Sequence, residues 1–222
     1  MRFLNRFSTL VFTSAMVGCF ATPASAISIN VANHSFEGPV TGTYAVIDPT
    51  GWTRYDGTVA SGVFRPSSYS ASGAGFIAGV HGDQTAYSSS GNFSQTLSEV
   101  LGVGTYNLTV AAGFRDDYYT PTTDYTINLL AGGSTIATAS NASNLHDGWS
   151  DIFATVTITS GNVLIGSPLG IQLVHSANNT QMNWDNVRLS LSVVPVPAAL
   201  PLFGTGLAAL GFLSWRRKRK KA

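Results

Sequence analysis

Cysteine is almost absent from this sequence. The single thiol, Cys19, lies in an apolar run near the N-terminus. If that run is removed during export, the remaining chain has no thiol and cannot form an intramolecular disulfide. Its stability must then come from apolar packing, with a bound metal ion as the other possible source. A chain of 222 residues is long enough for one domain with such a core.

Charged residues are also scarce, and they are unevenly placed. All 11 acidic residues lie between Glu37 and Asp185, and the whole middle of the chain, residues 27–194, holds only four arginines and no lysine, which gives it a net charge of −7. Six consecutive basic residues near the C-terminus hide this acidity in the overall balance. An acidic body repels phosphate backbones, and the basic run has no interleaved aromatic residues, so we expect no nucleic-acid partner.

Catalytic signatures are missing as well. The sequence contains no Gly-x-Ser-x-Gly and no His-Glu-x-x-His, and its four histidines are far apart with no metal-ligand spacing. On this basis we predict a protein that is not an enzyme, and we assign no catalytic residue.

The N-terminus has the pattern of a signal peptide. Arg2 and Arg6 precede the apolar run 10–20, which is followed by the small residues of Ala24-Ser25-Ala26. The run is too short for a comfortable membrane span, and the small-x-small pattern is the one that signal peptidase accepts. We therefore predict a signal peptide over residues 1–26, with cleavage after Ala26.

The C-terminus predicts a membrane span. Pro195, Val196 and Pro197 are followed by an uncharged stretch from Ala198 to Trp215 and then by the six basic residues. A helix over this stretch would be about 27 Å long at ~1.5 Å per residue, which is just enough to cross the hydrocarbon core. The basic cluster should stay on the cytoplasmic side, so the domain before it faces outward.

Residues 27–194 alternate between apolar and polar side chains, and Gly, Asn, Asp and Pro interrupt the runs at short intervals. No window of helical length has an apolar stripe of period 3.6. The pattern predicts an all-β fold with two packed antiparallel sheets. The clearest apolar faces are Tyr106/Leu108/Val110/Ala112/Phe114, Tyr125/Ile127/Leu129, Ile152/Ala154/Val156/Ile158 and Leu169/Ile171/Leu173.

The last predicted strand, 181–192, changes phase along its length. Met182 and Trp184 share one parity, whereas Val187 and Leu189 have the other. A β-bulge near Asp185 or Asn186 would bring all four side chains to the same face.

The C-terminal tail resembles the PEP-CTERM sorting signal of Gram-negative bacteria. The matching part is Pro195-Val196-Pro197 with the apolar and basic segments that follow, although the usual middle residue is Glu. The resemblance implies an exosortase-type processing protease as partner, an inner-membrane intermediate held by residues 198–215, and a final location at the cell surface or in the extracellular matrix. A plain single-span anchor is the alternative.

The middle of the chain resembles the galactose-binding-like jelly roll of carbohydrate-binding modules. The matching motifs occur in order: NHSFEGP at 33–39, GW at 51–52, FSQTL at 93–97, GTYNLTVAAGFR at 104–115, YTINLLAGGSTIA at 125–137 and WDNVRL at 184–189. The resemblance implies that the first and last strands are neighbours and that a structural Ca²⁺ ties them through Glu37 and Asp185. The alternative is that Glu37 caps a turn and Asp185 binds backbone amides at the bulge.

One loop combines acids with aromatic rings, the groups that bind the hydroxyls and the C–H faces of sugars. We predict a polysaccharide site there, with contributions from flanking loops. Its residues are Asp116, Asp117, Tyr118, Tyr119, Asp124 and Trp149.

Three functions follow from these observations. The first is an exported surface or matrix protein that binds polysaccharide without catalysis, and the second is a structural coat protein without a specific ligand. The third is an enzyme, because calcium-dependent cyanobacterial cyclases that close indole alkaloid rings resemble the same jelly roll and use an Asp as general acid. Asn183 and Asp185 share a strand face here, and an amide at the acid's place could not deliver the proton.

Overall fold

The computed structural model describes residues 26–56, 61–66, 81–113, 124–140, 149–176 and 180–193, together with 203, 206–208, 210 and 211. Residues 24–194 form one compact unit, which contains the β domain. Several residues of the predicted sites lie outside the described residues: Ala24, Asp116, Asp117, Tyr118, Tyr119, Pro195, Val196, Pro197, Ala198 and Trp215.

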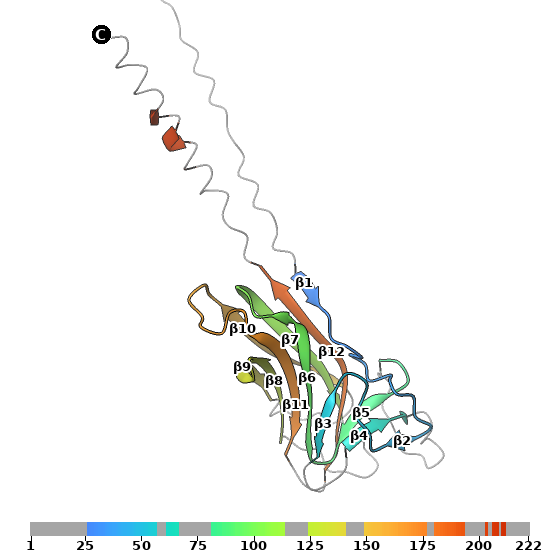
Figure 1. The fold of residues 1–222 in the computed structure, drawn as a ribbon. Coiled ribbons are helices and arrows are strands. Elements are labelled where there is room, and N and C mark those ends of the chain that lie inside the picture. Colours follow the sequence, from blue (N-terminus) through green and yellow to red (C-terminus); the bar gives the residue numbers. More distant parts are fainter. Residues whose placement is uncertain are drawn as a thin grey trace, which may run out of the picture. The chain divides into compact units, whose positions relative to one another are not determined.

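The domain consists of two antiparallel sheets (Figure 1), as the alternating pattern predicts. The seven-stranded sheet has the order β10 (Ser150–Ile158), β7 (Gly104–Gly113), β12 (Met182–Ser192), β5 (Thr85–Ser88), β4 (Ser61–Phe64) and β2 (Tyr44–Ala45), and β1 (Ala26–Ile29) also pairs with β12. The five-stranded sheet has the order β3 (Thr53–Asp56), β6 (Gly91–Val100), β11 (Pro168–His175), β8 (Tyr125–Ala131) and β9 (Ser134–Ala139).

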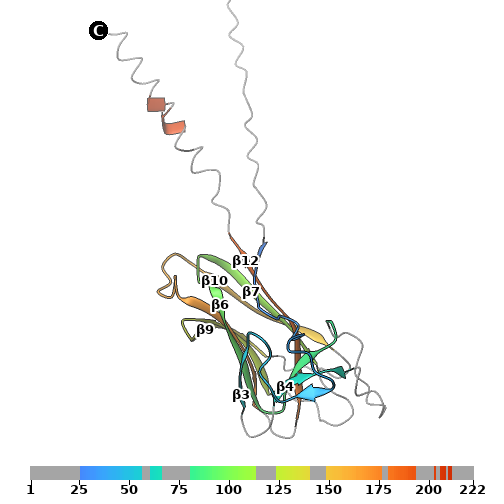
Figure 2. The same ribbon diagram turned by 45° about the vertical axis from the view of Figure 1, so that its right-hand side comes forward.

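The core lies between the two sheets, which face each other in Figures 1 and 2. Each predicted apolar face points into this core as far as it is described, with Val156 only partly buried. Trp52 also belongs to the core, where its ring centroid lies 5.2 Å from that of Phe36. Alternating strands that bury one face in this way are stabilised mainly by removing apolar surface from water.

The predicted bulge in β12 is present. Asp185 lies opposite Ala111 of β7 and Arg188 lies opposite Thr109, so β12 has one extra residue between the two pairs. Asn186, in this interval, has a φ of 45°, a left-handed conformation that Asn tolerates better than most residues. The bulge allows Trp184, Val187 and Leu189 to reach the same core.

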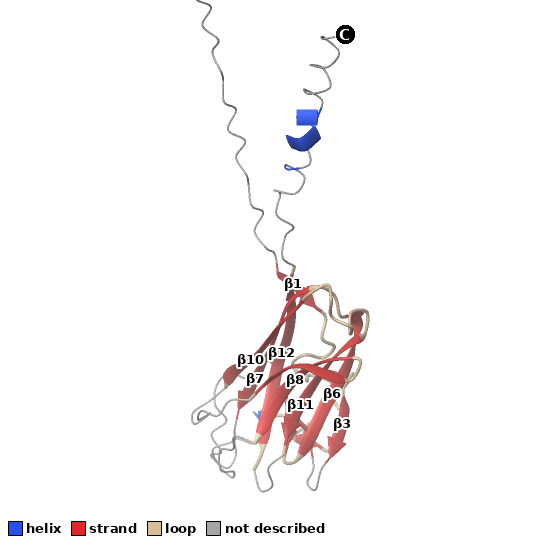
Figure 3. Cartoon of the chain, turned by 90° about the vertical axis from the view of Figure 1, so that its left-hand side faces the viewer, coloured by secondary structure: helices blue, strands red, loops and turns tan. Residues whose placement is uncertain are grey.

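The implied neighbourhood of the first and last strands is confirmed, because Ile27 to Ile29 pair with Leu191 to Leu189. Within the described residues no helix is long and apolar enough to cross a membrane, and the domain is built mainly of strands joined by loops (Figure 3). The membrane span of the tail therefore stays a prediction from the sequence.

Candidate functional site

Two polar residues of β12 lie on the outer face of the seven-stranded sheet. Trp184 points into the core, so Asn183 and Asp185 on either side of it point outward, as predicted from their spacing. Asn183 lies opposite Gly113, and Asp185 lies opposite Ala111. Both polar side chains have an exposed fraction of 0%, so this part of the outer face is buried rather than wet.

The carboxyl group of Asp185 is held by two backbone amides. Its Oδ2 accepts a hydrogen bond from the N–H of His81, and its Oδ1 accepts one from the N–H of Asn186, each at 2.6 Å. The pKa of Asp185 is raised from 3.8 to about 7, mainly by burial and to a smaller extent by the negative charge of Glu37, while the two amides act in the opposite direction. A carboxylate at this position is therefore costly to ionise unless a positive charge is supplied.

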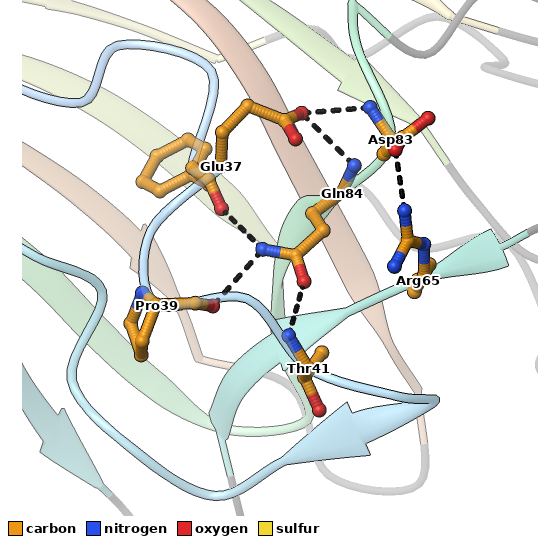
Figure 4. Close-up of polar contacts among 7 residues, drawn as sticks. Glu37, Pro39, Thr41, Arg65, Asp83 and Gln84 are labelled. Carbon is orange, nitrogen blue, oxygen red and sulfur yellow. Dashed lines mark hydrogen bonds and ion pairs between the residues drawn. The ribbon is translucent and has the colours of Figure 1, made fainter.

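Glu37 lies across a short loop, residues 81–84, from Asp185. Its Oε1 accepts hydrogen bonds from the N–H groups of Asp83 at 2.8 Å and Gln84 at 3.0 Å (Figure 4). A Cβ atom at Gly82, whose φ is +107°, would lie only 2.2 Å from this oxygen. Only glycine fits at this point, so the loop sequence is adapted to hold the carboxylate.

Gln84 fixes the chain around Glu37 (Figure 4). Its Nε2 donates to the carbonyl groups of Phe36 and Pro39, each at 3.1 Å, and its Oε1 accepts the N–H of Thr41 at 2.6 Å. The loop is also linked outward by the ion pair between Arg65 and Asp83. Hydrogen bonds with backbone groups, made by Glu37 itself and by Gln84, thus hold the Glu37 carboxylate in place.

Glu37 and Asp185 suit a hard cation such as Ca²⁺. The two carboxylates are close enough for the charge of one to raise the pKa of the other, and a bound cation would remove that cost. Among the described residues no cluster of three or more His, Cys, Asp or Glu side chains could hold a metal ion. The remaining oxygen ligands would have to be backbone carbonyl groups and water, both of which Ca²⁺ accepts.

Asn183 leaves a hydrogen-bond acceptor unused. Its Nδ2 lies 3.5 Å from the carbonyl oxygen of Gly113, but its buried Oδ1 has no partner among the described residues. A buried amide oxygen without a donor costs free energy, so it is a natural place for a donor from a ligand. The sequence offered one clue to this role, because Asn183 has the same strand parity as Asp185.

Trp149 lies against Gly113, the residue opposite Asn183. A Cβ atom at Gly113 would lie 2.9 Å from the indole ring, so the ring covers the residue that pairs with Asn183. Trp149 also lines a cavity of about 390 Å³, together with Ala111 and Asn186. The cavity therefore borders the backbone on which Asp185 lies, and it offers an aromatic ring face.

Of the residues proposed for sugar binding, the structure describes only Asp124 and Trp149. Asp124 precedes β8 in the five-stranded sheet, where its carbonyl group accepts the N–H of Ser176 at 2.9 Å. Trp149 precedes β10 in the other sheet. The loop with Asp116 to Tyr119, which would connect these two residues into one site, is outside the described residues, so the polysaccharide site stays a prediction.

Two histidines that are distant in the sequence meet in the structure. The ring centroids of His34 and His81 are 5.8 Å apart, and the hydroxyl of Ser35 lies 2.8 Å and 3.0 Å from their respective Nδ1 atoms. The four histidines are far apart in the sequence, and their spacing gives no sign of this contact. Sequence spacing missed it because the bond between Asp185 and the amide of His81 brings the second segment to the first.

Comparison with known proteins identifies relatives. The family model described as "HpiC1-like: HpiC1 cyclase" matches residues 27–190. The Stig cyclase Fisc from Fischerella sp. TAU, solved with (3Z)-3-(1-methyl-2-pyrrolidinylidene)-3H-indole, is 28% identical with a TM-score of 0.66, over 77% of this chain and 100% of that chain. Another cyclase from Fischerella sp. TAU, solved with 4-(1H-indol-3-yl)butan-2-one, is 25% identical with a TM-score of 0.62, over 75% and 98%.

The carbohydrate-binding likeness is weaker. The CBM22-1 xylan-binding domain of Paenibacillus barcinonensis Xyn10C is 17% identical with a TM-score of 0.47, over 78% of this chain and 98% of that chain. A likeness of this size carries no information about a ligand. No curated protein matches the sequence.

These relatives overturn one prediction. The absence of familiar catalytic motifs led us to predict a protein that is not an enzyme, and that prediction is wrong, because the family model and the aligned structures are those of cyclases. The motifs searched for belong to hydrolases and metalloproteases, and a ring closure needs neither a serine nucleophile nor a zinc-bound water. The chain belongs to the HpiC1-like cyclase family.

Proposed function

We propose that this protein is an exported, calcium-binding enzyme of the cyclase type whose substrate carries an indole or a similar aromatic ring with an N–H group. The observation that carries the proposal is the buried Oδ1 of Asn183, which lacks a donor among the described residues and whose opposite residue, Gly113, lies against the ring of Trp149. An indole offers one N–H donor on an otherwise apolar ring, which is the complement of this pair. The indole compounds held by two related cyclases support the same substrate class.

Asn183 and Trp149 would bind and orient the ring. An amide cannot protonate a substrate at neutral pH, so Asn183 acts as a hydrogen-bond acceptor and not as a general acid. Holding a flexible substrate in a folded conformation removes much of the entropy that a ring closure would otherwise lose. The buried outer face around Asn183 also excludes water from the reacting atoms.

Glu37 and Asp185 would hold the calcium ion. When bound, the ion would supply positive charge to this pair and fix loop 81–84, which both carboxylates already bind through its amides. We do not assign Asp185 as the proton donor, because each of its oxygens accepts a backbone N–H.

Binding of 4-(1H-indol-3-yl)butan-2-one to the calcium-loaded protein, measured by calorimetry, tests the proposal. We expect saturable binding that is weakened by Asn183→Leu and by Trp149→Ala. Tyr55→Ala is the control, since Tyr55 is on the five-stranded sheet with 71% of its surface exposed. Mass spectrometry should then detect ring closure of indole substrates that carry an unsaturated side chain. A folded, calcium-loaded protein that binds no indole compound would refute the proposal.

The export and sorting steps are part of the same proposal. Arg2 and Arg6 with the Ala24-Ser25-Ala26 motif support signal peptide removal, and the Pro195-Val196-Pro197 tail supports processing by an exosortase-type protease. Mass spectrometry of the protein from its host should find an N-terminus at Ile27 and a C-terminus before the basic cluster. A mature chain ending at Ala222 would reduce the tail to an ordinary anchor.

A further inference from the structure

One end of the β domain exposes apolar side chains, and we call it the apolar end. Its members are Val100, Val103, Val163 and Ile165, with exposed fractions of 54%, 50%, 95% and 40%, respectively. Val193, which follows β12, is also exposed, at 44%. Single exposed apolar residues are common on protein surfaces, but a group at one end of a domain indicates an interaction surface.

Backbone bonds hold these residues together. The turn between β6 and β7 contains Val103, and the segment between β10 and β11 contains Val163 and Ile165. The N–H of Leu101 donates to the carbonyl of Ser167, and the N–H of Gly166 donates to the carbonyl of Leu101, each at 2.9 Å. The valine-bearing segments are therefore one structured surface.

The same end contains the beginning of β1 and the end of β12 (Figure 1). Ile158, the last residue of β10, pairs with Gly104, the first residue of β7. The next residue of β7, Thr105, pairs with Ser192, which in turn pairs with Ala26. The chain thus leaves the domain at the apolar end toward the tail.

Charged residues are nearly absent from the segments that build this end, and Glu99, directly before Val100, lies at its border. Residues 26–29, 100–105, 157–168 and 189–193 contain no Asp, Glu, Lys or Arg, although the domain as a whole is acidic. Charged side chains would favour contact of this surface with water or with a charged partner. An uncharged apolar rim instead suits contact with lipid, and it keeps most of the acidic residues away from anionic headgroups.

The tail brings lipid within reach of this surface. Ser192 ends β12, and the predicted membrane span begins at Ala198. Six residues of fully extended chain cover at most about 21 Å. A bilayer that receives residues 198–215 is consequently close to the apolar end, and the tether raises the local concentration of the one for the other.

We propose that the apolar end docks on the lipid bilayer that the tail enters, with Val103, Val163 and Ile165 in the interfacial region. The docked domain presents its opposite end to the periplasm or the exterior. This inference rests on the predicted membrane span and is independent of the proposed cyclase activity.

Single-cysteine labelling of the full chain tests the proposal. Cys19→Ser removes the only thiol, and Val163→Cys, Tyr55→Cys and Phe203→Cys then carry a polarity-sensitive dye in separate samples. Tyr55 is the matched control, because it is exposed and pairs with Asn92 near the end of β6 that is far from Val100. Phe203 lies within the predicted span and reports insertion of the tail. The samples are reconstituted into phosphatidylethanolamine and phosphatidylglycerol vesicles.

We expect dyes at 163 and 203 to shift to the blue and to be shielded from iodide, with the dye at 55 unchanged. A dye at 163 that stays in water overturns the proposal, whether or not the dye at 203 enters lipid. Shielding at 55 as well as at 163 overturns it too, because the domain would then lie flat. A concentration-dependent shift at 163 without vesicles would assign the surface to a second copy of the chain instead.

Discussion

At the scale of single residues, Asn183 is the position where the effect of a substitution on ligand binding is most clearly separated from its effect on stability. Replacement by Leu, which has a similar size, removes a buried oxygen that lacks a donor among the described residues. The free energy of unfolding should stay the same or rise, because no satisfied hydrogen bond of normal length is lost. Affinity for an indole ligand should fall about fivefold to tenfold, the effect of one neutral hydrogen bond of ~1 kcal/mol. Urea unfolding and calorimetry on the same samples measure the two quantities.

The opposite pattern would contradict this role for Asn183. A large loss of stability with unchanged indole affinity would mean that the side chain holds the strand and not the ligand. Asn183→Asp provides a second comparison, because it keeps the shape of the side chain and adds a group able to ionise. Ligand affinity near that of the native chain only at low pH would indicate that the added carboxyl must be protonated to fit in the buried site.

The pair Glu37 and Asp185 predicts a response to calcium. Free calcium at about 100 times its Kd should stabilise the fold by about 2.7 kcal/mol, which is roughly 5–10 °C in Tm for a domain of this size. A chelator should remove this gain from the native chain. Glu37→Gln should abolish the response, since a neutral amide binds Ca²⁺ weakly, whereas Asp151→Asn, on β10, should keep it. Equal chelator effects in both variants would place the ion elsewhere.

At the scale of secondary structure elements, the bulge of β12 holds the candidate metal site. Asn186 has a φ of 45°, and its N–H donates to the Oδ1 of Asp185. Asn186→Val should cost about 1–2 kcal/mol, because a β-branched residue is strained in the left-handed region. Asn186→Gly keeps the backbone conformation and should be close to neutral. Urea unfolding gives the free energies, and the calcium affinity should fall in the Val variant alone. Equal stability of the two variants would show that the bulge is not strained.

The strands and the bulge were within reach of sequence reasoning, and the site was less so. Alternation at period two places Leu108, Val110 and Ile127 in the core, and the change of phase after Trp184 requires an extra residue in β12. The buried outer face has no such periodic signal. Asn183 becomes informative only when Gly113 of β7 and Trp149 are seen beside it, because these contacts join segments far apart in the chain.

The same limit explains the grouping of His34 with His81. Their meeting depends on loop 81–84 being bound by Glu37 and Asp185, two residues 148 positions apart in the sequence. A scan for short motifs examines only local spacing, so it could find neither this contact nor an enzyme whose site is assembled from distant strands. The family resemblance singled out Glu37 and Asp185 as a pair, since each lies in a short recognisable motif, and both bind amides of loop 81–84. Their role as calcium ligands stays a prediction.

At the scale of the whole molecule, two buried groups set how stability depends on pH. The pKa of Asp185 is raised to about 7 in the folded protein, so the metal-free fold binds this proton more tightly than the unfolded chain does. Its contribution falls as pH rises from about 4 to about 7. The pKa of His175 is lowered by burial, so its contribution is complete above its unfolded value of 6.5 and is lost as pH falls through the folded value.

Asp185 and His175 change stability in opposite directions as pH rises, and calcium should remove only the effect of Asp185. The metal-free protein should be most stable in mildly acidic solution and should lose stability toward pH 7.5. With saturating calcium, Asp185 is held ionised and this loss should disappear, because the ion supplies the charge that burial otherwise makes costly. Asp185→Asn should remove the loss of stability between about pH 4 and pH 7 without metal, and His175→Gln should remove only the opposite loss that sets in as pH falls below 6.5. Thermal unfolding from pH 4.5 to 8, with calcium and with chelator, measures all four profiles. A metal-free profile that rises steadily to pH 7.5 would mean that Asp185 is ionised without a cation, and the carboxylate pair would then be a backbone clamp and not a calcium site.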